Sequence, residues 1–176
     1  MRYYVCESEK PLGREEQREK AQELFRHALE KEIGVRVSYD YERDGQGKPL
    51  IPSPNSSLHL SVAHCKFAVV CIISDARVGI DVEEISRFDV KLSRRICTPK
   101  ELVLIEASEN KQEALCRCWT LKEAFYKMHG SGVFSEIETS EIKNSHVKKR
   151  DGTTPLLISI VSEKPLDDVT FCAYPS

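Results

Sequence analysis

Two periods of hydrophobic and polar residues occur along the chain, and together they predict a mixed α+β protein. Apolar side chains recur at helical spacing in residues 15–33, and Gly34 marks the end of that helix. Residues 35–41 alternate apolar and polar side chains, which predicts a half-buried strand. We expect further strands at residues 2–6, 58–62, 67–73, 78–85, 156–161 and 169–173, and further helices at residues 90–96, 99–107 and 112–129.

Residues 78–85 follow the most apolar predicted strand and a short turn. They contain side chains that could bind a ligand. In a strand, Ile80 and Val82 point to one face, whereas Asp81 and Glu83 point to the other. Two carboxylates on one face repel each other. Either water solvates this acidic face, or a hard divalent cation, which takes oxygen ligands, lies against it. The stretch by itself favours the solvated face and leaves the metal site open.

The predicted helix at residues 112–129 carries the second group of charged side chains. Glu123 and Lys127 lie four residues apart and therefore share one face, as exposed ion pairs commonly do. Glu123 also has apolar neighbours in sequence, so we expect it at the edge of the core, where a carboxylate needs a partner. Lys122 points in another direction, and we expect it to be solvated.

Composition narrows the class of protein. The 176 residues are 40% hydrophobic and 31% charged with a net charge of -2, which is typical of one globular domain and gives no general attraction to nucleic acid or to an anionic membrane. No apolar run has the length of a membrane span, and the first residues lack a signal-peptide core. The seven cysteines include no Cys-x-x-Cys pair. We therefore expect a reduced, cytoplasmic protein without disulfides or a zinc site.

Four sequence features are informative because of the order in which they occur along the chain. They are Gly47-Lys48-Pro49 in a loop, His64 after a strand, the run from Gly79 to Glu83, and the run Trp119-Thr120-Leu121-Lys122-Glu123-Ala124-Phe125-Tyr126-Lys127. Taken singly, a loop lysine is usually solvated and a lone histidine is usually structural. In this order, over residues 45–132, the features resemble the 4'-phosphopantetheinyl transferase superfamily, most closely the surfactin-synthetase-activating (Sfp-like) type.

The resemblance implies a fold and an activity. The fold would be an α+β chain of two similar halves, about residues 1–76 and 77–176, which form a pseudo-dimer with the active site in the cleft between them. Such a chain would act as a monomer. The activity would be transfer of 4'-phosphopantetheine from coenzyme A to a serine of an acyl or peptidyl carrier protein, with release of adenosine 3',5'-bisphosphate.

The resemblance also implies roles for individual residues. A magnesium or manganese ion would neutralise the diphosphate of coenzyme A. Glu123 would be a metal ligand first and a general base second, because a metal-bound carboxylate is a poor base. The implied metal ligands are Asp81, Glu83 and Glu123; the implied catalytic residues are Asp81, Glu123 and Lys127; and the implied coenzyme A contacts are His64, Lys48, Arg14 and Lys127.

The sequence departs from the family pattern at two points, and two alternative functions remain open. Ala63 and Cys65 flank the histidine where relatives usually have hydroxyl residues, and the N-terminal region is shorter than in well-known members. One alternative is a non-catalytic homologue that binds a carrier protein or coenzyme A. Another is a different metal-dependent phosphotransferase, for which the sequence offers no Gly-x-x-x-x-Gly-Lys-Ser/Thr loop. The three carboxylates and Lys127 together favour the transferase. The carrier's pathway, whether fatty acid, polyketide or nonribosomal peptide synthesis, stays open.

Overall fold

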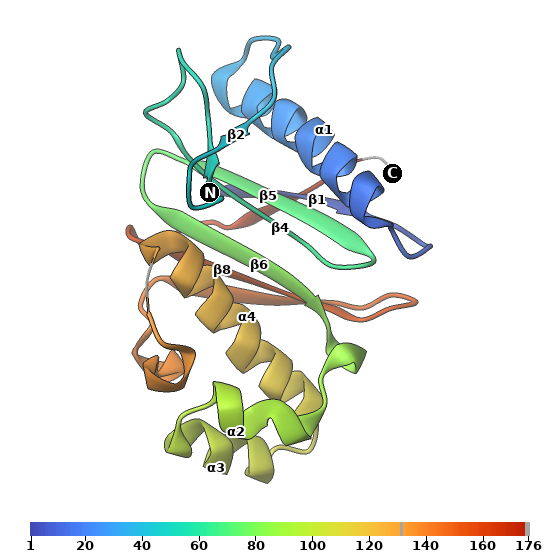
Figure 1. Ribbon diagram of the computed structural model, residues 1–176, viewed down its shortest axis with the longest axis vertical. Helices are drawn as coiled ribbons and strands as arrows, with labels where there is room; N and C mark the ends of the chain where they lie inside the picture. Colours follow the sequence, from blue (N-terminus) through green and yellow to red (C-terminus); the bar gives the residue numbers. More distant parts are fainter. Residues whose placement is uncertain (131, 175–176) are drawn as a thin grey trace.

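The computed structural model describes residues 1–130 and 132–174, apart from the side chain of Val90. Two larger β-sheets lie between two long helices, and two short strands form a third, small sheet (Figure 1). The first sheet has the strand order β4-β5-β1-β9, in which β5 is antiparallel to both neighbours and β9 is parallel to β1. Its strands are β1 (Arg2–Glu7), β4 (His59–His64), β5 (Ala68–Ser74) and β9 (Thr170–Ala173).

The second sheet is antiparallel throughout and has the order β6-β8-β7. Its strands are β6 (Val78–Glu84), β7 (Ser145–Arg150) and β8 (Leu156–Ser162). Helix α1 (Arg14–Ile33) covers the outer face of the first sheet, and helix α4 (Lys111–His129) packs against β6 and β8 of the second (Figure 1). The smaller elements are β2 (Glu42–Arg43), β3 (Pro49–Leu50), α2 (Ser93–Ile96), α3 (Pro99–Ala107) and the 3-10 turns η1 (Ile85–Arg87), η2 (Val90–Leu92), η3 (Phe134–Glu136) and η4 (Thr139–Glu141).

The alternation of side chains in β1 and β5 builds two cores from the same strands. Tyr4 and Cys71 point towards α1, where they join Phe25 in one apolar cluster. Tyr3 and Ile72 point to the opposite face, where a second cluster contains residues of both sheets. Fully burying a large apolar side chain contributes roughly 1.5–3 kcal/mol, so these layers supply much of the driving force for folding. The edge of the first sheet also meets β6, because the Ile80 amide donates to Ser61 Oγ at 3.0 Å.

Most predicted elements are confirmed, including how the helices begin and end. Thr98 accepts a hydrogen bond from the Glu101 amide and donates its own amide to the Glu101 carboxylate, so α3 begins with the expected capping box. Gly34 and Gly130 end α1 and α4 in the left-handed region, at φ 73° and 81°. The strand predicted at residues 67–73 is β5, which has partners on both sides as a central strand should.

The strand predicted at residues 35–41 is wrong. Its alternation is real, since Val37 and Tyr41 are buried against the first core. However, side chains of α1 take the hydrogen bonds that a neighbouring strand would otherwise make. The Val37 amide donates to Glu30 Oε1, and the Tyr41 amide and carbonyl both bond to the Gln22 side chain. These three backbone groups are therefore satisfied without a sheet.

A mixed α+β fold is thus observed, while the arrangement as two similar halves stays a prediction. The first sheet contains β9 from the C-terminal end of the chain, and the two sheets differ in their number of strands. Among the helices of the described residues, none combines the length and the apolar character needed to cross a bilayer.

Candidate active site

The acidic strand β6 and helix α4 meet at Gly79. A Cβ atom placed there would lie 1.8 Å from the Ala124 carbonyl oxygen and 2.8 Å from its carbonyl carbon, so only glycine allows this approach. The odd-numbered residues of β6 consequently face the helix. Ile80 and Val82 lie on the other side, in the core between the sheets, as the alternation predicts. The close contact therefore brings Asp81 of the strand beside the helix.

Asp81 is 6% exposed and has one satisfied and one unsatisfied oxygen. Lys127 Nζ donates to Asp81 Oδ1 at 2.6 Å and to the Ile80 carbonyl at 3.2 Å. Oδ2 is buried and has no hydrogen-bond partner within the part of the chain that the structure describes. Burial raises the pKa of Asp81, and the ammonium of Lys127 opposes that rise. An orphaned carboxylate oxygen in such a place calls for a cation or another donor.

Glu83 and Glu123 both lie in the electrostatic field of Asp81. Burial and the negative charge of Asp81 raise the pKa of Glu83 to about 7, although Arg87 Nη1 donates to Glu83 Oε2 at 2.6 Å. The same two causes raise the pKa of Glu123, which is half-buried, and Lys127 and Arg87 oppose the rise. The three carboxylates therefore form one cluster with an excess of negative charge.

The three carboxylates lie near one another, but their oxygens do not already form a complete chelating site for one cation. The ligand atoms of Asp81, Glu83 and Glu123 do not all lie within 4.8 Å of one another. Lys127 and Arg87 supply the positive charge that the carboxylates face. The donor set nevertheless suits a hard divalent cation, because all its atoms are carboxylate oxygens and Asp81 Oδ2 has no other partner in residues 1–130 and 132–174.

Lys122 is not solvated, so that prediction is wrong. Its side chain is 0% exposed, and its ammonium donates to the Ile96 carbonyl, the Phe134 carbonyl and Glu101 Oε2 at 2.9, 2.8 and 2.6 Å. Burial alone would raise the pKa of Glu101, but hydrogen bonds from Lys122 and from the Thr98 amide lower it overall. All three ammonium donors are used, so Lys122 fastens α4 to the segments around it.

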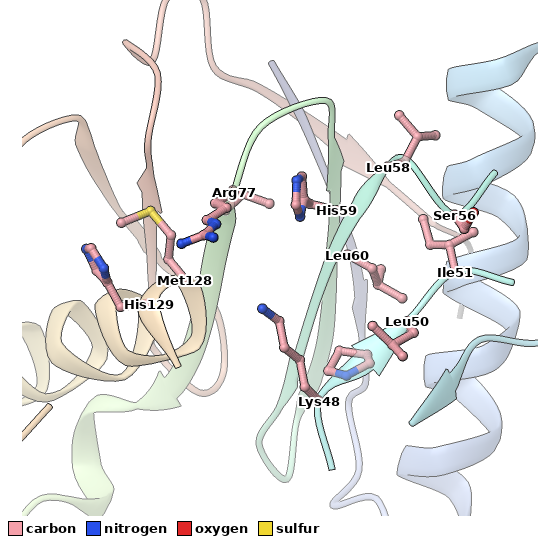
Figure 2. Close-up of a pocket in the computed structure, with 12 residues that line it drawn as sticks. Lys48, Leu50, Ile51, Ser56, Leu58, His59, Leu60, Arg77, Met128 and His129 are labelled. Carbon is pink, nitrogen blue, oxygen red and sulfur yellow. The ribbon is translucent and has the colours of Figure 1, made fainter. Parts of the chain in front are cut away.

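Two cavities near the end of α4 have basic linings. The larger, about 490 Å³, lies between β3, the start of β4 and the end of α4; Figure 2 shows Lys48 on one side and Arg77, Met128 and His129 on the other. The smaller, about 240 Å³, shares Lys48 and reaches Lys127. Among the described residues that line the two cavities, none is acidic. The basic lining residues are Lys48, His59, Arg77 and His129 in the larger cavity and Arg43, Lys48 and Lys127 in the smaller.

His64 and Arg14 lie outside both linings. His64 ends β4, and partial burial followed by the charges of Lys127 and Arg43 lowers its pKa, so these cations are its neighbours. Arg14 is the exposed first residue of α1. The start of α1 is tied to the turn after His64, because Gln17 Nε2 donates to the Cys65 carbonyl at 3.2 Å. The role of Arg14 stays a prediction.

Sequence reasoning missed three cations of this region. Arg87 lies four residues after Glu83 and pairs with it, but Glu83 belongs to strand β6 and Arg87 to the turn η1, so no helical spacing marks it as a partner. Arg43 and Arg77 carry no sequence mark either, since Arg43 lies in the short strand β2 and Arg77 in the turn before β6, and each approaches the site only through the fold.

Known proteins give a consistent family match. The family model described as the 4'-phosphopantetheinyl transferase superfamily matches residues 77–167, which include Asp81, Glu83, Glu123 and Lys127. The 4'-phosphopantetheinyl transferase psf-1 of Bacillus pumilus is 28% identical over 157 residues, or 85% of this chain and 67% of that protein. HetI of Nostoc sp., also a 4'-phosphopantetheinyl transferase, is 32% identical over 68% of this chain and 53% of its own length.

The extent of these matches is partial. The chain spans 67%, 41% and 53% of three curated relatives, psf-1, gsp of Aneurinibacillus migulanus and a 4'-phosphopantetheinyl transferase of Bacillus subtilis. Among solved structures, the holo-[acyl-carrier-protein] synthase of Thermotoga maritima aligns with 51% of this chain and 64% of its own, at 22% identity and a TM-score of 0.40. That structural likeness is too loose to support an argument about the present fold.

Proposed function

Because the chain belongs to the 4'-phosphopantetheinyl transferase superfamily, we propose that it transfers 4'-phosphopantetheine from coenzyme A to a serine hydroxyl of an acyl or peptidyl carrier protein. The other product is adenosine 3',5'-bisphosphate. One observation carries the proposal: the buried Asp81, with an oxygen that has no hydrogen-bond partner among the described residues, lies against Lys127 at the edge of a basic cavity.

Asp81, Glu83 and Glu123 would hold a magnesium ion. Their oxygens are the ligand type that magnesium prefers, and burial, together with the charge of Asp81 for the two glutamates, raises their pKa values, a rise that a bound cation would oppose. Manganese accepts similar ligands. When bound, the ion supplies charge neutralisation for the diphosphate of coenzyme A.

We assign to Lys127 the role of stabilising the negative charge that develops on the departing phosphate. Its ammonium lies 2.6 Å from Asp81 and also lines the smaller cavity, so it stands between the carboxylates and the space for an anion. A preorganised cation at this point stabilises the transition state more than the bound substrate.

Glu123 is the candidate for removing the serine proton. Burial and the charge of Asp81 raise its pKa, which makes its carboxylate a better base than an exposed glutamate. Metal ligation remains its first assigned role, since a carboxylate bound to a cation loses basicity. In either role Glu123 depends on the approach of α4 to β6 at Gly79.

The two basic cavities are the proposed site for coenzyme A. Their linings combine cations with apolar side chains, as a ligand with three phosphates and a purine base requires. Lys48 lines both cavities and is assigned to the adenosine end. His64 and Arg14, which lie near the β4–β5 turn, are assigned to phosphate contacts.

Both cavities are lined by residues from each side of residue 76, which supports a site between two halves of one chain, residues 1–76 and 77–176. We assign the active form to the monomer on this basis. Sedimentation at the protein concentration of the assay tests this assignment, and a dimer whose dissociation abolishes transfer would contradict it.

The experiment for the activity uses intact-protein mass spectrometry. Several carrier proteins of the acyl and peptidyl types are incubated with the chain, coenzyme A and magnesium. We expect the carrier mass to rise by one phosphopantetheinyl group, with no change for a carrier whose acceptor serine is replaced by alanine. Binding of coenzyme A without a mass change in any carrier would instead identify a non-catalytic homologue.

A further inference from the structure

Two cysteines outside the carboxylate cluster lie in direct contact. Cys97 Sγ and Cys118 Sγ are 3.4 Å apart, and both are free thiols. Cys97 follows α2 and precedes the cap of α3, whereas Cys118 lies in the middle of α4. Both are about 95% buried, at 4% and 5% exposure, so the fold holds the two sulfur atoms together.

Glu101 completes a group of three possible metal ligands with these thiols, since the ligand atoms all lie within 4.8 Å of one another. The carboxylate is already engaged, however. Its oxygens accept hydrogen bonds from Lys122 Nζ and from the amides of Thr98 and Thr139. A cation at this point would have to displace a buried ammonium, which disfavours a metal and leaves the chemistry of the thiol pair.

The surroundings of the two thiols shift their pKa values in opposite directions. The hydrogen bond with Cys118 lowers the pKa of Cys97 against the effect of burial, and the charge of Lys122 acts in the same direction. The pKa of Cys118 is raised by the same hydrogen bond and by burial. Burial raises the pKa of Cys65 to about 12, as in other isolated buried thiols. The pKa of Cys97 is therefore lowered and that of Cys118 raised, so the two thiols of the pair differ in acidity.

A cavity reaches one member of this pair, Cys118, which lies 3.4 Å from Cys97. This cavity of about 210 Å³ is lined by Cys118 and Glu101, together with Leu121 and Thr139. The volume accommodates several molecules of the size of water, so a small uncharged oxidant fits without unfolding of α4.

We propose that Cys97 and Cys118 are a site of reversible oxidation, at which hydrogen peroxide converts the two thiols into a disulfide. One sulfur, as the thiolate, attacks a peroxide oxygen; the O–O bond breaks, and hydroxide leaves and takes up a proton as water. The second sulfur displaces the oxygen of the resulting sulfenic acid as another water molecule. Two thiols and one peroxide thus give one disulfide and two waters.

The change in geometry is small. A disulfide has an S–S bond of roughly 2.05 Å, so the sulfur atoms must approach by about 1.3 Å. The bond would join the start of α3 to α4 at a point five residues before Glu123. This proposal concerns the thiols themselves and does not depend on the transferase activity.

The test is a peptide map of the folded protein under non-reducing conditions after brief treatment with hydrogen peroxide. We expect one cross-linked peptide pair containing Cys97 and Cys118, and recovery of both thiols after reduction. Cys116→Ser is the matched control, because Cys116 is buried two residues away on α4 without a thiol partner in the described chain. This variant should form the same cross-link, whereas Cys97→Ser should not.

Two outcomes would overturn the proposal. In one, the wild-type protein forms no Cys97–Cys118 cross-link while other cysteines become oxidised or Cys97 proceeds to the sulfinic acid. In the other, the purified protein retains one zinc ion per chain that Cys97→Ser loses, which would identify a metal site. The wild-type map decides the question even if a serine variant fails to fold. As a second readout, peroxide should raise the thermal midpoint of the wild-type protein and of Cys116→Ser, and reduction should reverse that rise.

Discussion

Replacement of Gly79 by alanine tests how the fold brings the two acidic segments together. The added Cβ would lie 1.8 Å from the Ala124 carbonyl oxygen, 2.8 Å from its carbonyl carbon and 3.0 Å from the Met128 amide nitrogen. All three are backbone atoms of α4, so no side-chain rotation relieves the clash. The helix must move away from β6 by roughly 1.5 Å to restore an ordinary contact.

The expected cost is at the upper end of the range for overpacking, about 3 kcal/mol of unfolding free energy, because the obstacle is backbone. The displacement also stretches the 2.6 Å contact between Lys127 and Asp81 and moves Glu123 away from the strand. We therefore expect Gly79→Ala to lose transfer activity even under conditions in which it remains folded.

Urea unfolding followed by circular dichroism measures the stability, and the carrier-mass assay measures the activity. Gly152→Ala is the matched control, because a Cβ there meets no atom within 4 Å and the residue has no positive φ. Its unfolding free energy should stay within about 0.5 kcal/mol of wild type. If Gly79→Ala were as stable and as active as Gly152→Ala, the close contact between β6 and α4 would not position the site.

Three further substitutions test other parts of the site. Lys122→Met should lower the unfolding free energy by about 3–5 kcal/mol because it leaves Glu101 buried without its ion-pair partner; exposed Lys143→Met should change it little, and an equally small loss for both would disprove the buried role. Asp81→Asn should abolish transfer without lowering the thermal midpoint, because it removes a buried charge; a transfer rate equal to wild type would exclude Asp81 from catalysis. Lys127→Ala should reduce kcat more than coenzyme A affinity, and a loss of affinity at unchanged kcat would contradict its transition-state role.

Local patterns predicted most of the secondary structure. The helical spacing in α1, the apolar run of β5 and the capping box of α3 each depend on interactions between residues near in sequence. Alternation in β6 also predicted correctly which side chains face away from the core between the sheets. The pattern at residues 35–41 failed because side chains of α1 replaced the hydrogen bonds of a strand.

Strand β7 was not predicted, because it lies at the edge of its sheet and reads Ser-His-Val-Lys-Lys-Arg. Charged residues suit an exposed edge, where they discourage pairing with other chains, so hydrophobic periodicity gives no signal there.

The environment of Lys122 could not be predicted from sequence. Its partners are Glu101 and two carbonyls that lie 12 and 26 residues away, and only the packing of α4 against α2, α3 and η3 brings them together. The basic linings of the two cavities likewise arise only from the packing of the folded chain. Lys48, Arg77 and His129 come from two separate loops and the end of α4, and none of them has a local pattern that predicts their proximity.

The most direct test of the account measures how many divalent cations the chain binds. Isothermal titration of manganese into the wild-type protein in the presence of coenzyme A should give one site per chain. Glu123→Gln, on the helix, and Asp81→Asn, on the strand, should each weaken that site at least tenfold. A wild-type chain that binds no cation, or a Glu123→Gln variant that binds it as tightly as wild type, would contradict the claim that the two segments share one ion.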